Sequence, residues 1–162
     1  MNRVLMIVDM QKGFINKEVY KDLQVRLNEY IKKSDYDTYI FTKFKNKKDS
    51  LYIEKLQWDE LLSTDSQEIC VDVPKNSVVF EKYGYGLSQT QVEEVKKLMK
   101  GEREIDICGL QTDVCVYAIA FQMFDNGIFP NILINYVATS VERIETSKDM
   151  LIHQFGQVDE RK

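Results

Sequence analysis

Histidine, cysteine and proline are scarce in this sequence, which has one, three and two of them in 162 residues. A single histidine, His153, cannot supply the ligands of a histidine-rich zinc site, so we expect no metal centre. The three cysteines are an odd number without Cys-x-x-Cys spacing, which argues against a disulfide framework. Free thiols are typical of a reducing compartment, and we therefore expect a cytoplasmic protein.

Long apolar runs and an excess of positive charge are also missing. Asp9 interrupts the short apolar run at residues 4–8, and no stretch is long enough to span a bilayer, so we expect neither a membrane segment nor a signal peptide. The net charge of -4 disfavours nucleic-acid binding, because contacts to phosphate need a clustered excess of Lys and Arg.

No sequence feature predicts an organic cofactor. There is no phosphate-binding loop, and Gly84-Tyr85-Gly86 lacks the third glycine of a dinucleotide-binding turn. With 44% hydrophobic and 30% charged residues, the chain has the composition of an ordinary globular protein. The partners we expect are a small-molecule substrate and further copies of the chain, with neither nucleic acid nor membrane among them.

Continuous apolar runs alternate with helical patterns along the whole chain. We expect strands at residues 4–8, 38–44, 77–80, 105–108 and 132–137, with a short edge strand at 157–158. We expect helices at residues 23–31, 53–62, 88–99, 112–126 and 143–155. Strands that are apolar throughout are typical of a parallel sheet covered on both faces. The sequence therefore predicts one α/β domain over residues 1–162, a Rossmann-like fold with three α/β/α layers.

Three residues with useful chemistry follow predicted strands. Asp9 comes directly after the first strand, Lys82 closely follows the third, and Cys115 stands at the start of the helix after the fourth. Taken singly, they could be a turn carboxylate, a solvated surface charge and a small buried hydrophobe. Together they match the rule that ligands bind at the carboxyl ends of parallel strands.

Cys115 has the surroundings of a reactive thiol, whereas Cys70 and Cys108 have the pattern of buried structural ones. The first-turn amide groups and dipole of a helix favour a thiolate, and unpaired N–H groups there can hold a developing oxyanion. A neighbouring Asp9 would oppose the thiolate and Lys82 would favour it, so we expect coupled titration of the three groups.

At these positions the sequence resembles the isochorismatase-like cysteine hydrolases, which include isochorismatases, nicotinamidases, N-carbamoylsarcosine amidases and ureidoacrylate hydrolases. Three segments in family order carry the resemblance: Val8-Asp9-Met10-Gln11 with Phe14, Val79-Phe80-Glu81-Lys82, and Gly109-Leu110-Gln111-Thr112-Asp113-Val114-Cys115-Val116. The resemblance implies the α/β/α fold and a catalytic triad of Asp9, Lys82 and Cys115. It also implies a cis peptide between Leu110 and Gln111, which would aim the backbone N–H groups of Gln111 and Cys115 at one oxyanion.

The resemblance further implies acyl transfer from a small amide or ureide-like compound. Asp9 would take the Cys115 proton, the thiolate would attack the carbonyl carbon, and an amine or ammonia would leave. Water activated by Asp9 would then cleave the thioester, while Lys82 holds Asp9 in place and balances its charge.

The sequence departs from the nicotinamidases, which place an Asp-x-His pair of metal ligands after the second strand. Residues 41–46 read Phe-Thr-Lys-Phe-Lys-Asn here, which argues against that activity. Candidates for lining a substrate pocket, each of which could equally belong to the core, are Phe14, Tyr83, Tyr85 and Tyr117. Trp58 has the helical spacing of a packing residue, and we do not expect it to contact substrate.

Other functions stay open at this stage. A vinyl ether hydrolase of the isochorismatase type would use Asp9 as an acid and would not need Cys115 as a nucleophile. A catalytically degenerate binding or scaffold protein would be expected to lack part of the triad, yet all three residues are present. A redox-sensing thiol would need a resolving cysteine, and Cys108 is expected to point into the sheet layer. The helix at 114–124 is apolar nearly all round, so we expect a homo-oligomer.

Overall fold

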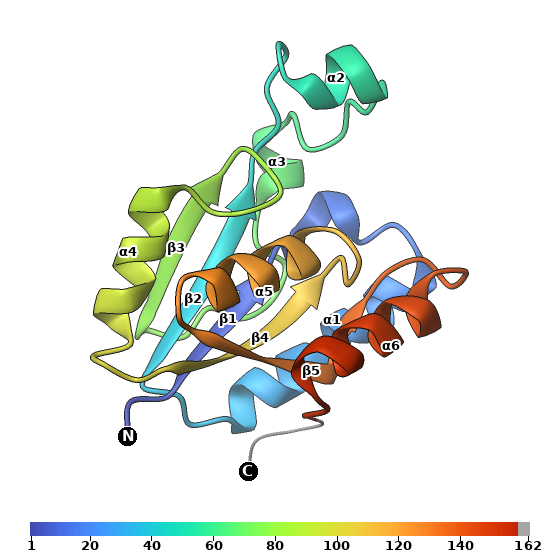
Figure 1. Cartoon of the computed structure of the whole chain (residues 1–162). Helices are drawn as coiled ribbons and strands as arrows, with labels where there is room; N and C mark the ends of the chain where they lie inside the picture. Colours follow the sequence, from blue (N-terminus) through green and yellow to red (C-terminus); the bar gives the residue numbers. More distant parts are fainter. Residues whose placement is uncertain (159–162) are drawn as a thin grey trace.

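The alternating strands and helices form a five-stranded parallel sheet with helices on both faces (Figure 1). The computed structural model of the chain describes residues 1–158. The strands are β1 (Val4–Val8), β2 (Thr38–Phe44), β3 (Ser77–Lys82), β4 (Glu104–Leu110) and β5 (Phe129–Ala138). Their order in the sheet is β3-β2-β1-β4-β5. The predicted fold class, a single α/β domain around a parallel sheet, is confirmed.

Each face of the sheet has its own hydrophobic core. Helix α1 (Glu18–Lys33) covers one face, and α4 (Gln89–Leu98), α5 (Cys115–Asp125) and α6 (Ile144–Phe155) cover the other. Every residue of β1 is buried, with Leu5 and Ile7 on the α1 side and Met6 and Val8 on the opposite side. This burial on both faces explains why β1 is apolar throughout instead of alternating.

Two predicted helices differ from the structure. The helix expected at 53–62 is limited to α2 (Leu51–Leu56), because Gln57 takes the left-handed conformation and ends it. The short helices η1 (Lys12–Phe14) and α3 (Thr64–Gln67) complete the list. Helix α5 has no side-chain cap at Thr112 or Asp113, since it begins only at Cys115 after a turn. The capping box that opens α4 at Ser88 is confirmed.

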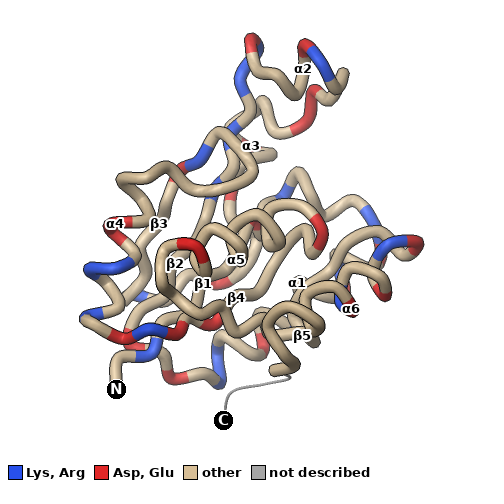
Figure 2. Tube along the Cα trace, in the orientation of Figure 1, with Lys and Arg blue, Asp and Glu red and all other residues tan. Residues whose placement is uncertain are grey.

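The apolar surface of α5 is partly covered inside the chain. Its only charged residue is Asp125, and the helix is drawn almost entirely tan in Figure 2. The ring of Phe121 packs on Phe155 of α6 at 5.2 Å between centroids, whereas Phe124 is 52% exposed. The expected subunit interface on α5 stays a prediction. No helix within residues 1–158 has the length and apolar character of a membrane span.

Candidate active site

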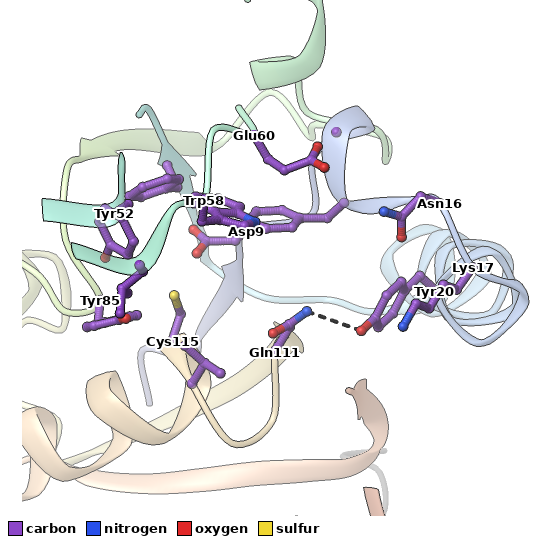
Figure 3. Close-up of a pocket in the computed structure, with 15 residues that line it drawn as sticks. Asp9, Asn16, Lys17, Tyr20, Tyr52, Trp58, Glu60, Tyr85, Gln111 and Cys115 are labelled. Carbon is purple, nitrogen blue, oxygen red and sulfur yellow. Dashed lines mark hydrogen bonds between the residues drawn. The ribbon is translucent and has the colours of Figure 1, made fainter. Parts of the chain in front are cut away.

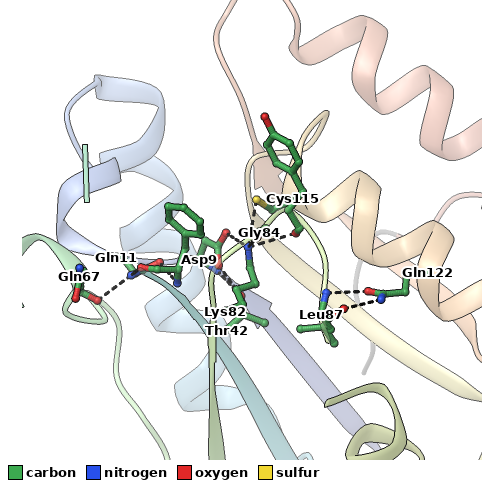
Figure 4. Close-up of polar contacts among 11 residues, drawn as sticks. Asp9, Gln11, Thr42, Gln67, Lys82, Gly84, Leu87, Cys115 and Gln122 are labelled. Atoms are coloured by element: carbon green, nitrogen blue, oxygen red, sulfur yellow. Dashed lines mark hydrogen bonds and ion pairs between the residues drawn. The ribbon is translucent and has the colours of Figure 1, made fainter. Parts of the chain in front are cut away.

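The carboxyl ends of the strands bring the three predicted catalytic residues together (Figure 4). Asp9 follows β1, Lys82 ends β3, and Cys115 begins α5 after β4. The strand order reverses between β1 and β4, which is where parallel sheets open a crevice for ligands. Lys82 Nζ lies 2.9 Å from Asp9 Oδ2 and 3.4 Å from Cys115 Sγ. One ammonium therefore links the carboxylate and the sulfur.

Asp9 is held by Thr42 of the adjacent strand. The backbone N–H of Asp9 donates to Thr42 Oγ1 at 3.0 Å, and Thr42 Oγ1 donates to Asp9 Oδ1 at 2.6 Å. Apart from the ion pair with Lys82, Asp9 Oδ2 has no partner within residues 1–158, so it is free to accept a proton. Sequence reasoning missed Thr42, although a polar residue in the apolar run of β2 was a usable signal.

Lys82 is almost completely buried and its ammonium is surrounded by acceptors. Besides Asp9 and Cys115, Nζ donates to the carbonyl oxygens of Gly84 at 2.8 Å and Tyr85 at 3.3 Å. Burial would lower the pKa of Lys82, but its interactions with Asp9 and Cys115 outweigh this effect and raise the pKa above its usual value. Lys82 is therefore a permanent cation of the site.

The surroundings of Cys115 favour the protonated thiol over the thiolate. Burial, followed by the charge of Asp9, raises the pKa of the Cys115 thiol well above its ordinary value, while Lys82 lowers it. Burial therefore opposes the thiolate that the helix N-terminus was expected to favour. A thiol that is protonated at rest needs a base beside it before it can attack a substrate.

Two backbone N–H groups near Cys115 have no acceptor. The peptide bond between Leu110 and Gln111 is cis, and the carbonyl oxygen of Gln111 accepts from the N–H groups of Val114 and Val116. Within the described part of the chain, the N–H groups of Gln111 and Cys115 have no hydrogen-bond partner. Such unpaired donors are suited to hold a developing negative charge.

A glycine lets this turn approach β1. At Gly109, φ is +113°, and a Cβ atom would lie 2.2 Å from the carbonyl oxygen of Val8, so no other residue fits without moving the backbone. The close approach of β4 to β1 sets the position of the turn that carries Gln111 and Cys115.

Asp9 and Cys115 line a cavity of about 410 Å³ (Figure 3), and Lys82, which contacts both of them, does not line it. Phe14 and Tyr85 line it, as expected, but Tyr83 and Tyr117 do not. Tyr83 is 49% exposed, with Lys47 Nζ 4.0 Å from its ring centre. Tyr117 lies two positions after Cys115, which turns it about 200° around the helix, onto Phe121. Neither of these two tyrosines borders this cavity.

One wall of the cavity comes from residues 46–62, a segment that the sequence pattern did not place at a pocket. Tyr52, Leu56, Trp58 and Glu60 line the cavity from this segment. Trp58 was expected to be a packing residue of a helix, but it follows the end of α2 and faces the cavity (Figure 3). Its ring centre lies 6.2 Å from that of Phe14, nearly parallel.

The remaining lining residues come from β2, the segment around η1 and the turn before α5. They are Gly13, Asn16, Lys17, Tyr20, Phe44, Gln111 and Val114. The hydroxyl of Tyr20 accepts a hydrogen bond from Gln111 Nε2 at 3.1 Å. A substrate therefore cannot use that acceptor position.

The donor set of the cavity does not fit zinc. Its carboxylates are Asp9, which is bound to Lys82 and Thr42, and Glu60 at the exposed end. His153 lies on α6 and does not line the cavity. Within residues 1–158 no three His, Cys, Asp or Glu side chains are grouped as metal ligands.

Comparison with known families agrees with this fold. The isochorismatase domain family matches residues 3–158, and the chain belongs to that family. It is an isochorismatase-family hydrolase. No curated protein sequence matches it.

Solved structures share the fold across nearly their whole length. An isochorismatase-like hydrolase from Alkaliphilus metalliredigens has a TM-score of 0.83 at 14% identity and covers 98% of this chain and 94% of its own. Pyrazinamidase from Pyrococcus horikoshii, in complex with zinc, has a TM-score of 0.79 at 19% identity, and the match covers 96% of this chain and 97% of the pyrazinamidase. N-carbamoylsarcosine amidase from Thermoplasma acidophilum has a TM-score of 0.78 at 18% identity, and the match covers 99% of this chain and 96% of the amidase. At these identities the likeness shows a common fold.

Proposed function

We propose that this protein hydrolyses a C–N bond of a small amide or ureide-like compound. Cys115 is the nucleophile, Asp9 is the general base and acid, and Lys82 holds Asp9 and balances the charge of the site. The observation that carries the proposal is the position of Lys82 Nζ, which contacts both the carboxylate and the sulfur beneath one cavity. No other feature of the fold requires this buried arrangement.

The reaction follows from the protonation states of the site. Asp9 takes the proton of Cys115, and the new thiolate, beside Lys82, attacks the carbonyl carbon of the substrate. The oxyanion of the tetrahedral intermediate lies against the N–H groups of Gln111 and Cys115, where each donor contributes about 3 kcal/mol. The protonated Asp9 gives its proton to the leaving nitrogen, and the amine departs.

The second half of the reaction returns the enzyme to its resting state. Asp9, ionised again, takes a proton from water, and the hydroxide formed attacks the thioester carbon. The carboxylic acid leaves and Cys115 recovers its proton. The amide class is supported by the relatives named above, two of which are described as amidases, and by a cavity sized for a small molecule.

The test is a screen of small primary amides, ureides and N-carbamoyl compounds for ammonia or amine release. We expect Cys115→Ala to lower turnover of any substrate found by about ten-thousandfold or more. Intact mass spectrometry should find the acyl group on wild-type Cys115 and none on the variant.

Cys108→Ala serves as the matched control, because its thiol is fully buried between sheet and helix and outside the cavity. Full activity of Cys115→Ala would contradict the proposal. Full activity of that variant toward a vinyl ether such as isochorismate would favour the ether hydrolase, the alternative that does not need a nucleophilic sulfur.

A further inference from the structure

Residues 46–62 form a self-contained segment at the carboxyl edge of the sheet, where α2 projects from the body of the domain (Figure 1). Asn46 binds both ends of it. Its side-chain oxygen accepts from the N–H of Lys47 and from Ser50 Oγ, and its Nδ2 donates to the carbonyl oxygens of Trp58 and Glu60. A buried asparagine thus fixes the position of a wall that is otherwise held by few contacts.

Tyr52 presents a polar atom to the cavity from this wall, which also contributes the polar groups of Trp58 and Glu60. Its ring lies between those of Phe44, at 5.1 Å, and Tyr85, at 5.2 Å, and it lines the same cavity as Asp9 and Cys115 (Figure 3). These ring contacts limit how far the phenol can swing. The hydroxyl therefore has a defined place on the side of the cavity that faces the nucleophile.

The hydroxyl of Tyr52 has no hydrogen-bond partner among residues 1–158. Polar atoms of partly buried side chains normally have one, from the protein or from a ligand. Burial, followed by the surrounding groups of the site, raises the pKa of this hydroxyl, so it keeps its proton. It is a hydrogen-bond donor without an acceptor.

Three of the other polar groups of the cavity already have roles in the proposed reaction, whereas the side chains of Asn16, Lys17 and Glu60, which also line it, have none. The N–H groups of Gln111 and Cys115 take the carbonyl oxygen, and Asp9 serves the leaving nitrogen. Tyr52 comes from the opposite wall, and what remains for it is the acyl part of the substrate. The surrounding surface there is aromatic, so a polar atom on the acyl group would lose its bond to water and needs a replacement.

We propose that Tyr52 is a substrate-positioning residue, whose hydroxyl donates a hydrogen bond to an acceptor atom on the acyl group, and that the substrates are amides carrying such an acceptor near the carbonyl. The inference rests on the proposed function for the identity of the scissile bond. It goes further by assigning the acyl-side contact and the class of acyl group.

The test uses two amides of nearly the same shape, pyrazinamide, which has ring nitrogens as acceptors, and benzamide, which has none. Each is measured by how far it slows the alkylation of Cys115 by iodoacetamide, which gives an apparent Kd without requiring turnover. In Tyr52→Phe we expect the ratio of the pyrazinamide Kd to the benzamide Kd to rise about fivefold relative to wild type. Differences in hydrophobicity between the two amides cancel in this comparison.

Tyr83→Phe is the matched control, since it removes a hydroxyl from an exposed ring outside the cavity. It should leave the ratio and the unprotected alkylation rate unchanged, and for Tyr52→Phe each Kd is calculated from that variant's own unprotected rate. A change of less than twofold in Tyr52→Phe, an equal change in Tyr83→Phe, or no protection by either amide would overturn the inference. Failure of the proposed hydrolysis is a separate result, because it appears as missing turnover and leaves the protection ratio intact.

Discussion

The floor and the wall of the cavity are built in different ways. The floor consists of Asp9, Lys82 and Cys115, which stand at strand ends and are between 1% and 9% exposed. The wall is the segment 46–62, where Leu51 and Leu56 are 69% and 59% exposed. Strand ends cannot move without breaking the sheet, whereas the wall is held by the hydrogen bonds of Asn46 and by ring contacts of Tyr52 and Trp58. The difference suggests a division of labour, with chemistry set by the sheet and selectivity set by the segment.

The largest effect is expected from breaking the floor with Lys82→Met. This change leaves the Asp9 carboxylate buried without its cation, and losing one partner of a buried ion pair costs about 3 to 5 kcal/mol. The free energy of unfolding, measured with urea, should fall by that amount. Turnover of an amide substrate should fall by more than about a thousandfold, because the base is no longer held.

Lys45→Met is the control for this experiment. Lys45 pairs with Glu81 at 3.2 Å, but both side chains are partly exposed, at 31% and 48%. An exposed ion pair contributes less than about 1 kcal/mol, so the variant should unfold almost as wild type does. Equal losses in the two variants would mean that the buried pair has no special part in holding the floor.

A smaller effect is expected from loosening the wall with Asn46→Ala. The variant loses the contacts that Asn46 makes to both ends of the segment, and we expect the free energy of unfolding to fall by about 2 kcal/mol. Hydrogen exchange should become faster at residues 47–60 and stay unchanged in β1 and β4. KM should rise more than kcat falls, because the wall binds the substrate and the floor performs the reaction.

Asn28→Ala is the comparison for this variant, since Asn28 accepts a single hydrogen bond, from the N–H of Asp72, on the opposite side of the sheet from α4 and α5. It should have little effect on KM or on exchange in the segment. If exchange in Asn46→Ala rose equally in the strands, the wall would be part of the same cooperative unit as the floor. The proposed division would then be wrong.

The same contrast explains what the sequence could predict. Asp9, Lys82 and Cys115 follow apolar strands whose period is easy to recognise, and parallel strands must end at a common edge. Thr42 was missed because its role depends on the register of β2 beside β1, which places it opposite the end of the neighbouring strand. Register between strands far apart in the sequence is not visible in a local pattern.

The wall could not be predicted for a related reason. Trp58 continues a helical spacing, but Gln57 ends α2 in the left-handed conformation, and the ring turns toward Phe14. That path is set by Asn46, a residue whose side chain bonds to backbone atoms 12 and 14 positions away. Tyr83 does not line the cavity, whereas Tyr85 does. The carbonyl groups of Gly84 and Tyr85 in this turn face Lys82, and a sequence pattern does not show that orientation.

The smallest effect is expected for Trp58→Leu, which should change the alkylation rate of the Cys115 thiol very little. In wild type, burial raises the pKa of Cys115, so its alkylation by iodoacetamide should become faster as the pH rises from 7 to 9 and the thiolate fraction grows. A neutral indole carries no charge, so the variant's rate should stay within about twofold of wild type at each pH. Protection by benzamide should nevertheless weaken, since the amide loses an aromatic surface of the cavity. A rate already maximal at pH 7 in wild type would contradict the raised pKa, and a shifted pH profile in Trp58→Leu would show that wall and floor are coupled.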